Sequence, residues 1–259
     1  MMASALLYER HDRVTVLAIN RPETRNALDD ATSHEIRAAL KACETDGTRC
    51  IVLTGAGGAF SSGADIKKAF SMGITPEASR QTLTEAYWPM LKAIRAASWP
   101  VIAAVDGYAA GIGCDLALTC DLRLVSDRGR FAELYARVGL IPDGGGTYLL
   151  PRLVGLGREM ELMFTGRDVL AEEAVRIGLA NQVYPTADFM THVLDYAQQI
   201  ARMSPHALKR GKAAMLAALS SSYDDALARE ADYQIEIFQQ SDGLEGFQAF
   251  IEKRDPHWR

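Results

Sequence analysis

Two short, largely apolar segments between predicted helices restrict the fold of this sequence more than any other feature. Cys50-Ile-Val-Leu-Thr54 and Val101–Val105 lack the alternation of apolar and polar residues that marks a strand with one exposed face. Sequence patterns predict a helix before each of them, from the N-cap Asp29 to about Glu44 and over about 79–97. Strands that alternate with helices in this way predict an α/β fold whose sheet is largely covered.

The remaining elements divide the chain into two parts. The other elements predicted before residue 185 are strands at Leu6–Arg10, Val14–Asn20 and Leu122–Val125 and a glycine-punctuated helix at Gly107–Leu118. Beyond about Ala187 only helical patterns follow, one starting at the N-cap pair Ser204-Pro205 and two more at about 223–240 and 244–252. We therefore expect an α/β core over residues 1–185 and a helical C-terminal region over residues 186–259.

The composition is that of an ordinary globular protein. Of the 259 residues, 48% are hydrophobic and 24% are charged, which is enough apolar material for a sizeable core and excludes a disordered chain. No run of about 18 apolar residues is present, so no membrane-spanning helix is expected. The N-terminus lacks the basic and apolar regions of a secretion signal. These features predict a cytoplasmic protein without a membrane partner.

Charge, cysteine and histidine usage argue against several kinds of partner. The formal net charge is −5 and no Lys/Arg run is longer than two residues, so binding to nucleic acid is not expected. The four cysteines form no C-x-x-C pair, which is typical of a reducing compartment. The five histidines are dispersed without an i, i+4 pair, so no metal site is predicted.

Two glycine-rich segments follow the buried strands, Gly57-Gly-Ala-Phe-Ser-Ser-Gly-Ala-Asp-Ile-Lys67 and Asp106-Gly-Tyr-Ala-Ala-Gly-Ile-Gly-Cys-Asp115. The dinucleotide fingerprint G-x-G-x-x-G fails in both regions, at Phe60 and at Leu116, where its third glycine belongs. The second segment leads into a predicted helix, and backbone N–H groups at such a helix start can bind an anion or a developing oxyanion. The glycines equally suit two tight turns, and their spacing alone leaves both interpretations open.

These segments belong to a set of six motifs that spans nearly the whole chain. The motifs are Asn20-Arg-Pro-Glu-Thr-Arg-Asn-Ala-Leu28, Ile51-Val-Leu-Thr-Gly55, Phe60-Ser-Ser-Gly-Ala-Asp-Ile-Lys67, Pro100-Val-Ile-Ala-Ala-Val-Asp-Gly107, Gly139-Leu-Ile-Pro-Asp-Gly-Gly-Gly-Thr147 and Ala249-Phe-Ile-Glu-Lys-Arg254. In this order they closely resemble the crotonase (enoyl-CoA hydratase/isomerase) superfamily. The resemblance implies an α/β spiral of repeated β-β-α turns with a helical C-terminal trimerisation region, assembled as a homotrimer or a dimer of trimers. It also implies an acyl-CoA thioester substrate and no separate cofactor, because CoA is part of the substrate.

The resemblance also implies roles for individual residues. Ala64 and Ile112 match the positions whose backbone N–H groups form an oxyanion hole, where two fixed donors stabilise a thioester enolate. Phe250 and Lys253 match a C-terminal pair that reaches CoA, often from a neighbouring subunit. Without the resemblance, Phe250 would be interpreted as a core aromatic, and Lys67 and Lys253 as solvated surface residues. The residues that match the CoA-binding neighbourhood are Arg25, Ala27, Ser62, Asp65, Ile66 and Lys67.

The positions of the two catalytic glutamates depart from the family pattern. Asp115 stands at the first position and is one methylene shorter. Tyr135 stands at the second, and we interpret it as a pocket wall. Glu133 precedes Tyr135 by two residues and would point to another face of a predicted helix. The two-glutamate arrangement with which the usual hydratase adds water is therefore incomplete.

Asp143 offers a substitute carboxylate. It matches an acid that several isomerases and a dehalogenase branch of the family use, and the lack of a histidine between residues 34 and 192 disfavours dehalogenation. Its place between a proline and three glycines would also suit an N-cap or a turn. Asp115 lies in an apolar run, where an unpaired carboxylate is unfavourable, so it is either functional or a buried structural partner. We predict that Asp115 and Asp143 are the catalytic residues.

Three functions follow from these residues. The leading hypothesis is an enoyl-CoA isomerase, in which an aspartate moves a proton while the oxyanion hole holds the enolate. The second is an enoyl-CoA hydratase in which Asp115 and Asp143 jointly position water. The third is an acyl-CoA-binding family member without catalysis, which two carboxylates near the predicted thioester argue against.

Overall fold

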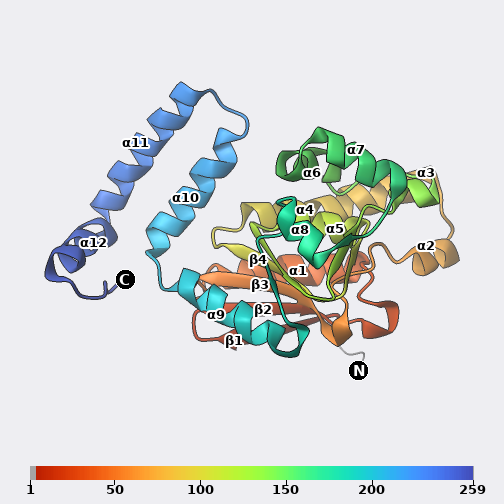
Figure 1. Cartoon of the computed structure of the whole chain (residues 1–259), viewed down its shortest axis with the longest axis horizontal. Helices are drawn as coiled ribbons and strands as arrows, with labels where there is room; N and C mark the ends of the chain where they lie inside the picture. Colours follow the sequence, from red (N-terminus) through yellow and green to blue (C-terminus); the bar gives the residue numbers. More distant parts are fainter. Residues whose placement is uncertain (1–3, 259) are drawn as a thin grey trace.

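A six-stranded sheet forms the centre of the computed structural model, which describes residues 4–258 (Figure 1). Its strand order is β1-β2-β3-β4-β6-β9, with β1 antiparallel to β2 and every other neighbouring pair parallel. The strands are β1 (Leu6–His11), β2 (Val14–Ile19), β3 (Cys50–Gly55), β4 (Val101–Val105), β6 (Leu122–Ser126) and β9 (Gln182–Tyr184). The largely apolar strands β3 and β4 lie in the middle, as their composition predicts.

A second, smaller sheet has three strands, and its first strand leads into the candidate site. In it β5 (Tyr108–Ala110) pairs in parallel with β7 (Arg130–Ala132), which pairs antiparallel with β8 (Val169–Leu170). The helices are α1 (Asp30–Cys43), α2 (Ile66–Met72), α3 (Pro76–Gln81), a π-helical turn (Thr82–Tyr87), α4 (Trp88–Ala96), α5 (Ile112–Thr119), α6 (Gly146–Val154), α7 (Leu156–Thr165), α8 (Ala171–Arg176), α9 (Phe189–Ala201), α10 (Pro205–Ala218), α11 (Tyr223–Gln239) and α12 (Ser241–Glu252).

Apolar side chains cover both faces of the large sheet. On one face Leu53 belongs to the same cluster as Ile36 of α1. On the other face Val52 packs in a cluster with Val193 of α9. The α/β fold with a covered sheet is thus confirmed. The helical region expected from residue 186 onward consists of α9, which covers the sheet, and α10–α12, which extend away from it (Figure 1).

Two predicted helices have different bounds in the structure. The segment predicted as a helix over Gly107–Leu118 begins as β5, and α5 starts only at Ile112. The reason is that β5 hydrogen-bonds to β7, a partner that the local pattern does not show, and that Gly111 turns the chain with a φ of 52°. The helix predicted over 79–97 starts earlier, at Pro76, and consists of α3, the π-helical turn and α4.

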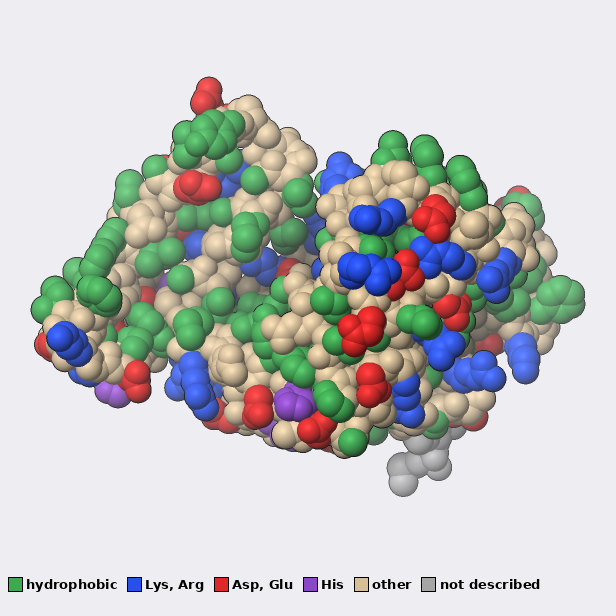
Figure 2. Space-filling view, in the orientation of Figure 1, with side chains coloured by type: hydrophobic (Ala, Val, Ile, Leu, Met, Phe, Trp, Pro, Cys, Tyr) green, Lys and Arg blue, Asp and Glu red, His purple; other side chains and the backbone are tan. Residues whose placement is uncertain are grey.

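Helices α10–α12 form an arm at one end of the molecule, and Figure 2 shows a hollow between the arm and the core. Ser204 begins α10 as predicted, since its hydroxyl oxygen accepts the Ala207 N–H at 3.1 Å. Within residues 4–258, no helix is long and apolar enough to cross a membrane. The hollow is lined largely by apolar side chains, among them Leu118, Leu149, Leu153, Leu208, Met215, Leu216 and Leu219.

Candidate active site

The structure brings the two glycine-rich segments side by side. Ser61 donates its backbone N–H to the Tyr108 carbonyl at 2.9 Å, and the Ala110 N–H donates to the Ser61 carbonyl at 3.0 Å. A side chain on Gly63 would place its Cβ 2.7 Å from the Ala110 carbonyl oxygen, so only glycine fits at this crossing. The same Cβ position lies 3.6 Å from the Ile112 nitrogen. The backbone around Gly63 is therefore a neighbour of the start of α5.

The Ala64 and Ile112 amides both lie at this crossing. Ile112 is the first residue of α5, so its N–H has no acceptor inside the helix. Among residues 4–258, no protein oxygen accepts a hydrogen bond from either amide. Two neighbouring N–H groups without partners are what a developing oxyanion requires. This geometry is compatible with the predicted oxyanion hole, whose role in the reaction remains a prediction.

Asp115 lies on α5, one turn after Ile112, and its side chain is fully buried. Its Oδ2 atom accepts the Tyr135 hydroxyl and, at 3.0 Å, the Gly144 N–H. A Cβ on Gly144 would lie 2.6 Å from Oδ2, so glycine permits this close approach. Burial raises the pKa of Asp115 to about 7; the Tyr135 hydrogen bond opposes the shift, and the charge of Asp143 adds to it. Burial therefore makes Asp115 easier to protonate than a free aspartate.

Tyr135 lies close to both predicted catalytic acids. It begins the 3-10 helix η4 (Tyr135–Val138) and is buried, and the prediction of a pocket wall did not include its hydrogen bond to Asp115. Burial raises the pKa of Asp143, and the nearby Tyr135 hydroxyl lowers it. Asp115, Tyr135 and Asp143 thus form one group, although they lie on three separate segments of the chain.

Asp143 lies half-buried in the loop before α6. It is not the N-cap of that helix, because the N-cap is Gly145 and no side chain accepts a hydrogen bond there. The Trp88 indole N–H donates to the Asp143 carbonyl at 2.8 Å, so α4 holds the loop from the other side. The sequence analysis missed Trp88. The sequence shows only a large aromatic residue within a predicted helix. In the structure Trp88 begins α4 and is 40% exposed.

The position of Glu133 differs from the one predicted from the sequence. We expected a helix that would turn Glu133 away from the face of Tyr135, but the helix begins only at Tyr135 and Glu133 follows directly on β7. The 100° rotation per helical residue therefore does not apply, and Glu133 points inward with 2% of its surface exposed. Among the described residues, neither carboxyl oxygen of Glu133 has a hydrogen-bond partner. Burial, and then the charge of Asp115, raise the pKa of Glu133 well above its usual range.

Four of the residues predicted to meet CoA lie together. The Ser62 N–H donates to the Arg25 carbonyl at 2.9 Å. Arg21 donates to the Ala27 carbonyl at 2.6 Å and pairs with the Asp65 carboxylate at 2.7 Å. Asp65 is also the N-cap of α2. Because its side chain is engaged in these contacts, Asp65 has a structural role in addition to the predicted one.

The other predicted CoA residues lie at two distant places. Ile66 and Lys67 are exposed on α2, whereas Phe250 and Lys253 lie at the end of α12. Figure 1 shows α2 and α12 at opposite ends of the molecule. A single chain therefore does not bring these residues together, and the C-terminal pair would meet CoA only at the site of another copy.

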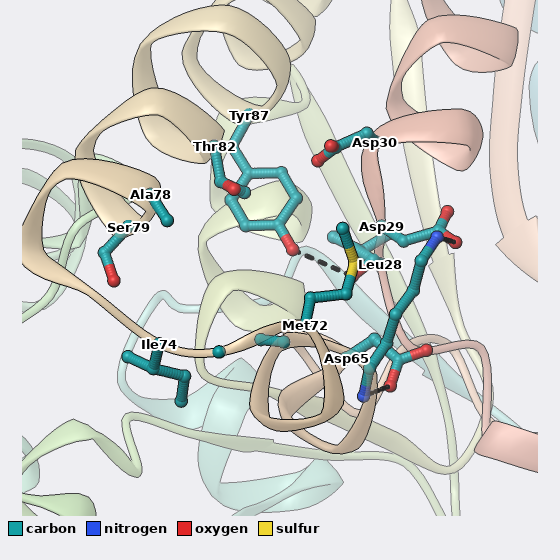
Figure 3. A pocket seen from close by; sticks show the side chains of 13 residues that line it. Leu28, Asp29, Asp30, Asp65, Met72, Ile74, Ala78, Ser79, Thr82 and Tyr87 are labelled. Atoms are coloured by element: carbon teal, nitrogen blue, oxygen red, sulfur yellow. Dashed lines mark hydrogen bonds and ion pairs between the residues drawn. The ribbon is translucent and has the colours of Figure 1, made fainter.

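A pocket of about 170 Å³ opens beside this region, between the α2–α3 segment and the start of α1 (Figure 3). Leu28 connects the pocket to the crossing, because it pairs with Ala64 and its carbonyl accepts the Tyr87 hydroxyl at 2.8 Å. Met72, Ile74 and Tyr87 line the pocket. It is a candidate space for part of an acyl-CoA molecule.

Comparison with known proteins decides the family. The model of the enoyl-CoA hydratase/isomerase family matches residues 9–259. The chain belongs to this family. It is 41% identical to the probable enoyl-CoA hydratase of Rhodobacter capsulatus, over 100% of this chain and 99% of the relative. It is 36% identical to the short-chain-enoyl-CoA hydratase of Clostridium acetobutylicum, over 98% of this chain and 97% of the relative.

Structural similarity to the enoyl-CoA hydratase/isomerase family extends over nearly the whole chain. The crystal structure of an enoyl-CoA hydratase from Bacillus anthracis matches with a TM-score of 0.94 at 32% identity and covers 98% of each chain. The resemblance predicted from six motifs, the crotonase fold and the enzymatic nature of the chain are thereby confirmed. The names of these relatives support hydratase chemistry more than the isomerase chemistry that the sequence analysis favoured.

Proposed function

We propose that this enzyme adds water to the double bond of a 2-enoyl-CoA thioester. The observation that carries the proposal is the group of Asp115, Tyr135 and Asp143. Asp115 lies one turn after Ile112, whose amide and the neighbouring Ala64 amide have no protein acceptor among residues 4–258. The relatives named enoyl-CoA hydratases support the same reaction. Hydration, the second hypothesis of the sequence analysis, thus replaces isomerisation as the leading one.

In this proposal Asp143 carries the proton. The Ala64 and Ile112 N–H groups hold the thioester oxygen, where negative charge develops. Ionised Asp143 takes a proton from water while the water oxygen bonds to C3, and the double-bond electrons move onto the thioester oxygen. Protonated Asp143 then returns that proton to C2. One water molecule is consumed, and no proton is left over.

Asp115 acts through Tyr135 in this reaction. Its Oδ2 atom already accepts two hydrogen bonds, and its side chain has no exposed surface. Asp143 is only half-buried and is the acid of the pair that a substrate can reach. Asp115 would therefore fix the direction of the Tyr135 hydroxyl, whose oxygen is left to accept a hydrogen bond from the attacking water.

Isomerisation is the second candidate, and the burial of Asp115 favours it. With one accessible acid, the site needs no second glutamate to move a proton from C2 to C4 of a 3-enoyl-CoA on one face of the substrate. The same oxyanion hole and the same Asp143 would serve. The two reactions differ in whether water is held beside C3.

Product analysis in D2O with a 2-enoyl-CoA and a 3-enoyl-CoA of equal chain length distinguishes the candidates. Hydration is expected to convert the 2-enoyl-CoA to the 3-hydroxyacyl-CoA with deuterium at C2. Conversion of the 3-enoyl-CoA to the 2-enoyl-CoA without a hydroxylated product would support isomerisation. If neither substrate is converted, the protein is a non-catalytic acyl-CoA-binding member and the proposal is wrong.

We also propose that the enzyme assembles as a homotrimer or a dimer of trimers. Phe250 on α12 is 82% exposed and lies far from α2 of its own chain. A neighbouring chain could both cover this aromatic side chain and receive Lys253 at its CoA site. Sedimentation velocity is expected to give the mass of three or six chains, and a monomer would contradict this arrangement.

A further inference from the structure

Three carboxyl groups that form no ion pair among residues 4–258 lie around α5. Asp115, Glu133 and Glu159, which we call the buried acid cluster, come from α5, the segment after β7, and α7. Their exposed fractions are 0%, 2% and 6%. Within residues 4–258, no hydrogen-bond partner exists for Asp115 Oδ1, for either Glu133 oxygen or for Glu159 Oε2. The buried acid cluster therefore needs an explanation beyond packing.

Asp115 and Glu133 approach each other beside Gly146. A Cβ on Gly146 would lie 2.4 Å from Asp115 Oδ1 and 3.4 Å from Glu133 Oε2. The two oxygens without partners thus border the same small space, which any larger residue at position 146 would fill. The opposite oxygen of Asp115, Oδ2, is the one that accepts the Tyr135 hydroxyl.

Glu133 is the member of the cluster best suited to keep its proton. Neighbouring carboxylates repel one another, and an ionised carboxylate that is buried without partners is strongly unfavourable. Asp115 receives two hydrogen bonds that stabilise its ionised form, from Tyr135 and Gly144, whereas Glu133 receives none of this kind. The small cavity beside Glu133 is largely apolar and is lined by Phe131, Ala132, Leu150, Leu162, Val169 and Leu179, together with Cys114 and Arg167.

We propose that Glu133 is a positioning residue that, as a neutral carboxylic acid, donates a hydrogen bond to Asp115 Oδ1 and holds Asp115 ionised. In that state Asp115 Oδ2 accepts the Tyr135 hydroxyl hydrogen and fixes its direction, so that the Tyr135 oxygen is left to accept a hydrogen bond from the attacking water. The role of Glu133 in turnover rests on the proposed function, whereas its protonation state does not.

The protonation state of Glu133 determines whether its replacement raises or lowers the pKa of Asp115. If Glu133 is neutral, its removal takes a donor from ionised Asp115 and raises the pKa of Asp115. If Glu133 were ionised, its removal would take away a repelling charge and lower that pKa. The titratable groups that face Glu133 are Cys114 and Asp115 from α5, Glu159 from α7, Asp143 from the loop before α6, and Arg167, which is paired with Glu161 and Glu173.

Infrared spectroscopy of the whole enzyme without substrate tests the protonation state directly. At pH 8 a C=O stretch of a protonated carboxylic acid is expected in the wild type and in Glu161→Gln, an exposed control on the same helix as Glu159. The band should be absent in Glu133→Gln. A wild-type spectrum without this band, or a band that survives in Glu133→Gln, would overturn the proposal.

The pH at which Asp115 is half-protonated tests the coupling between Glu133 and Asp115. This midpoint is measured from the infrared band that Asp115→Asn lacks. It is expected to rise by about one to two pH units in Glu133→Leu and by less than about half a unit in Glu133→Gln, whose amide still donates. A midpoint that falls or stays constant in Glu133→Leu contradicts the proposal. Circular dichroism checks the fold, and if Glu133→Leu is unfolded, the absence or survival of the infrared band in Glu133→Gln decides.

Kinetics with a 2-enoyl-CoA then test the role in turnover. Glu133→Leu is expected to lower kcat about tenfold with little change in KM, because Glu133 does not touch the substrate, and Glu133→Gln should recover most of the loss. A kcat that Glu133→Leu leaves at the wild-type value would refute the positioning role. If the enzyme converts no enoyl-CoA at all, the proposed function fails while the infrared result stands on its own.

Discussion

Replacing Asp115 by asparagine is expected to stabilise the folded protein at and above neutral pH. The pKa of Asp115 rises from its ordinary value of 3.8 to about 7 in the fold, chiefly because the side chain is buried. Between these two pH values the folded protein keeps a proton that the unfolded chain has lost. The free energy of unfolding therefore falls as the pH rises, and the shift corresponds to a loss of about 4 kcal/mol by pH 8.

Asparagine at position 115 avoids this loss and fits the site. Its carbonyl can accept the Tyr135 hydroxyl and the Gly144 N–H as Oδ2 does. Its amide can donate into the space beside Gly146, where a neutral Glu133 can accept through its carbonyl oxygen. The free energy of unfolding of Asp115→Asn should exceed that of the wild type by about 4 kcal/mol at pH 8 and by less than about 2 kcal/mol at pH 5.

Urea unfolding at several pH values measures this difference. The protein concentration must be the same throughout, because assembly of several chains would add a concentration-dependent contribution to stability. Glu161→Gln, which changes an exposed acid on α7, should show no comparable pH-dependent difference. If Asp115→Asn is less stable than the wild type at pH 8, or if the difference does not vary with pH, then burial does not raise the pKa of Asp115 as this reasoning requires.

Three further predictions concern the oxyanion hole, CoA and the catalytic loop. Ile112→Pro should preserve α5, since proline is favoured at the first helical position. It should lower kcat/KM about 100-fold or more relative to Ile112→Ala, which keeps the N–H. Equal activities of the two variants would exclude this amide as a donor. Lys67→Glu or Lys253→Glu should weaken binding of a CoA thioester several-fold in calorimetry and leave a pantetheine thioester unaffected, and an equal effect on both would indicate a change in folding or assembly instead. Trp88→Phe removes the hydrogen bond to the Asp143 carbonyl and should lower kcat about three- to tenfold, whereas an unchanged kcat would mean that the loop is held without it.

The parts of the fold that depend on local pattern were predictable. The apolar strands β3 and β4 and the start of α1 after Asp29 lie where periodicity and capping chemistry put them, and the Asp29 carboxylate accepts the Thr32 N–H at 2.9 Å. Strand β5 was not predictable, because its three residues are extended only through pairing with β7, some twenty residues further along the chain. Local propensity for a helix is overridden there by a tertiary contact.

The candidate site was predictable in part for the same reason. The motifs indicated Asp115, Asp143 and the two amides, because these positions lie in segments whose sequences resemble a family. The Tyr135 hydrogen bond and the inward direction of Glu133 depend on where η4 begins and on how closely two glycines let the loop approach α5. Such contacts join residues far apart in the sequence, and no pattern within one segment contains them.

The central claim is that Asp143 moves the proton while the Ala64 and Ile112 amides hold the thioester oxygen. The most direct test is kcat/KM for the hydration of a 2-enoyl-CoA by the wild type, Asp143→Asn and Asp115→Asn side by side. Asp143 does not cap α6, so Asp143→Asn should keep the fold. The account predicts that this variant loses about 10²–10⁴-fold in kcat/KM, and that Asp115→Asn loses less. Near-wild-type hydration by Asp143→Asn would contradict the account and leave Asp115 as the remaining candidate for proton transfer.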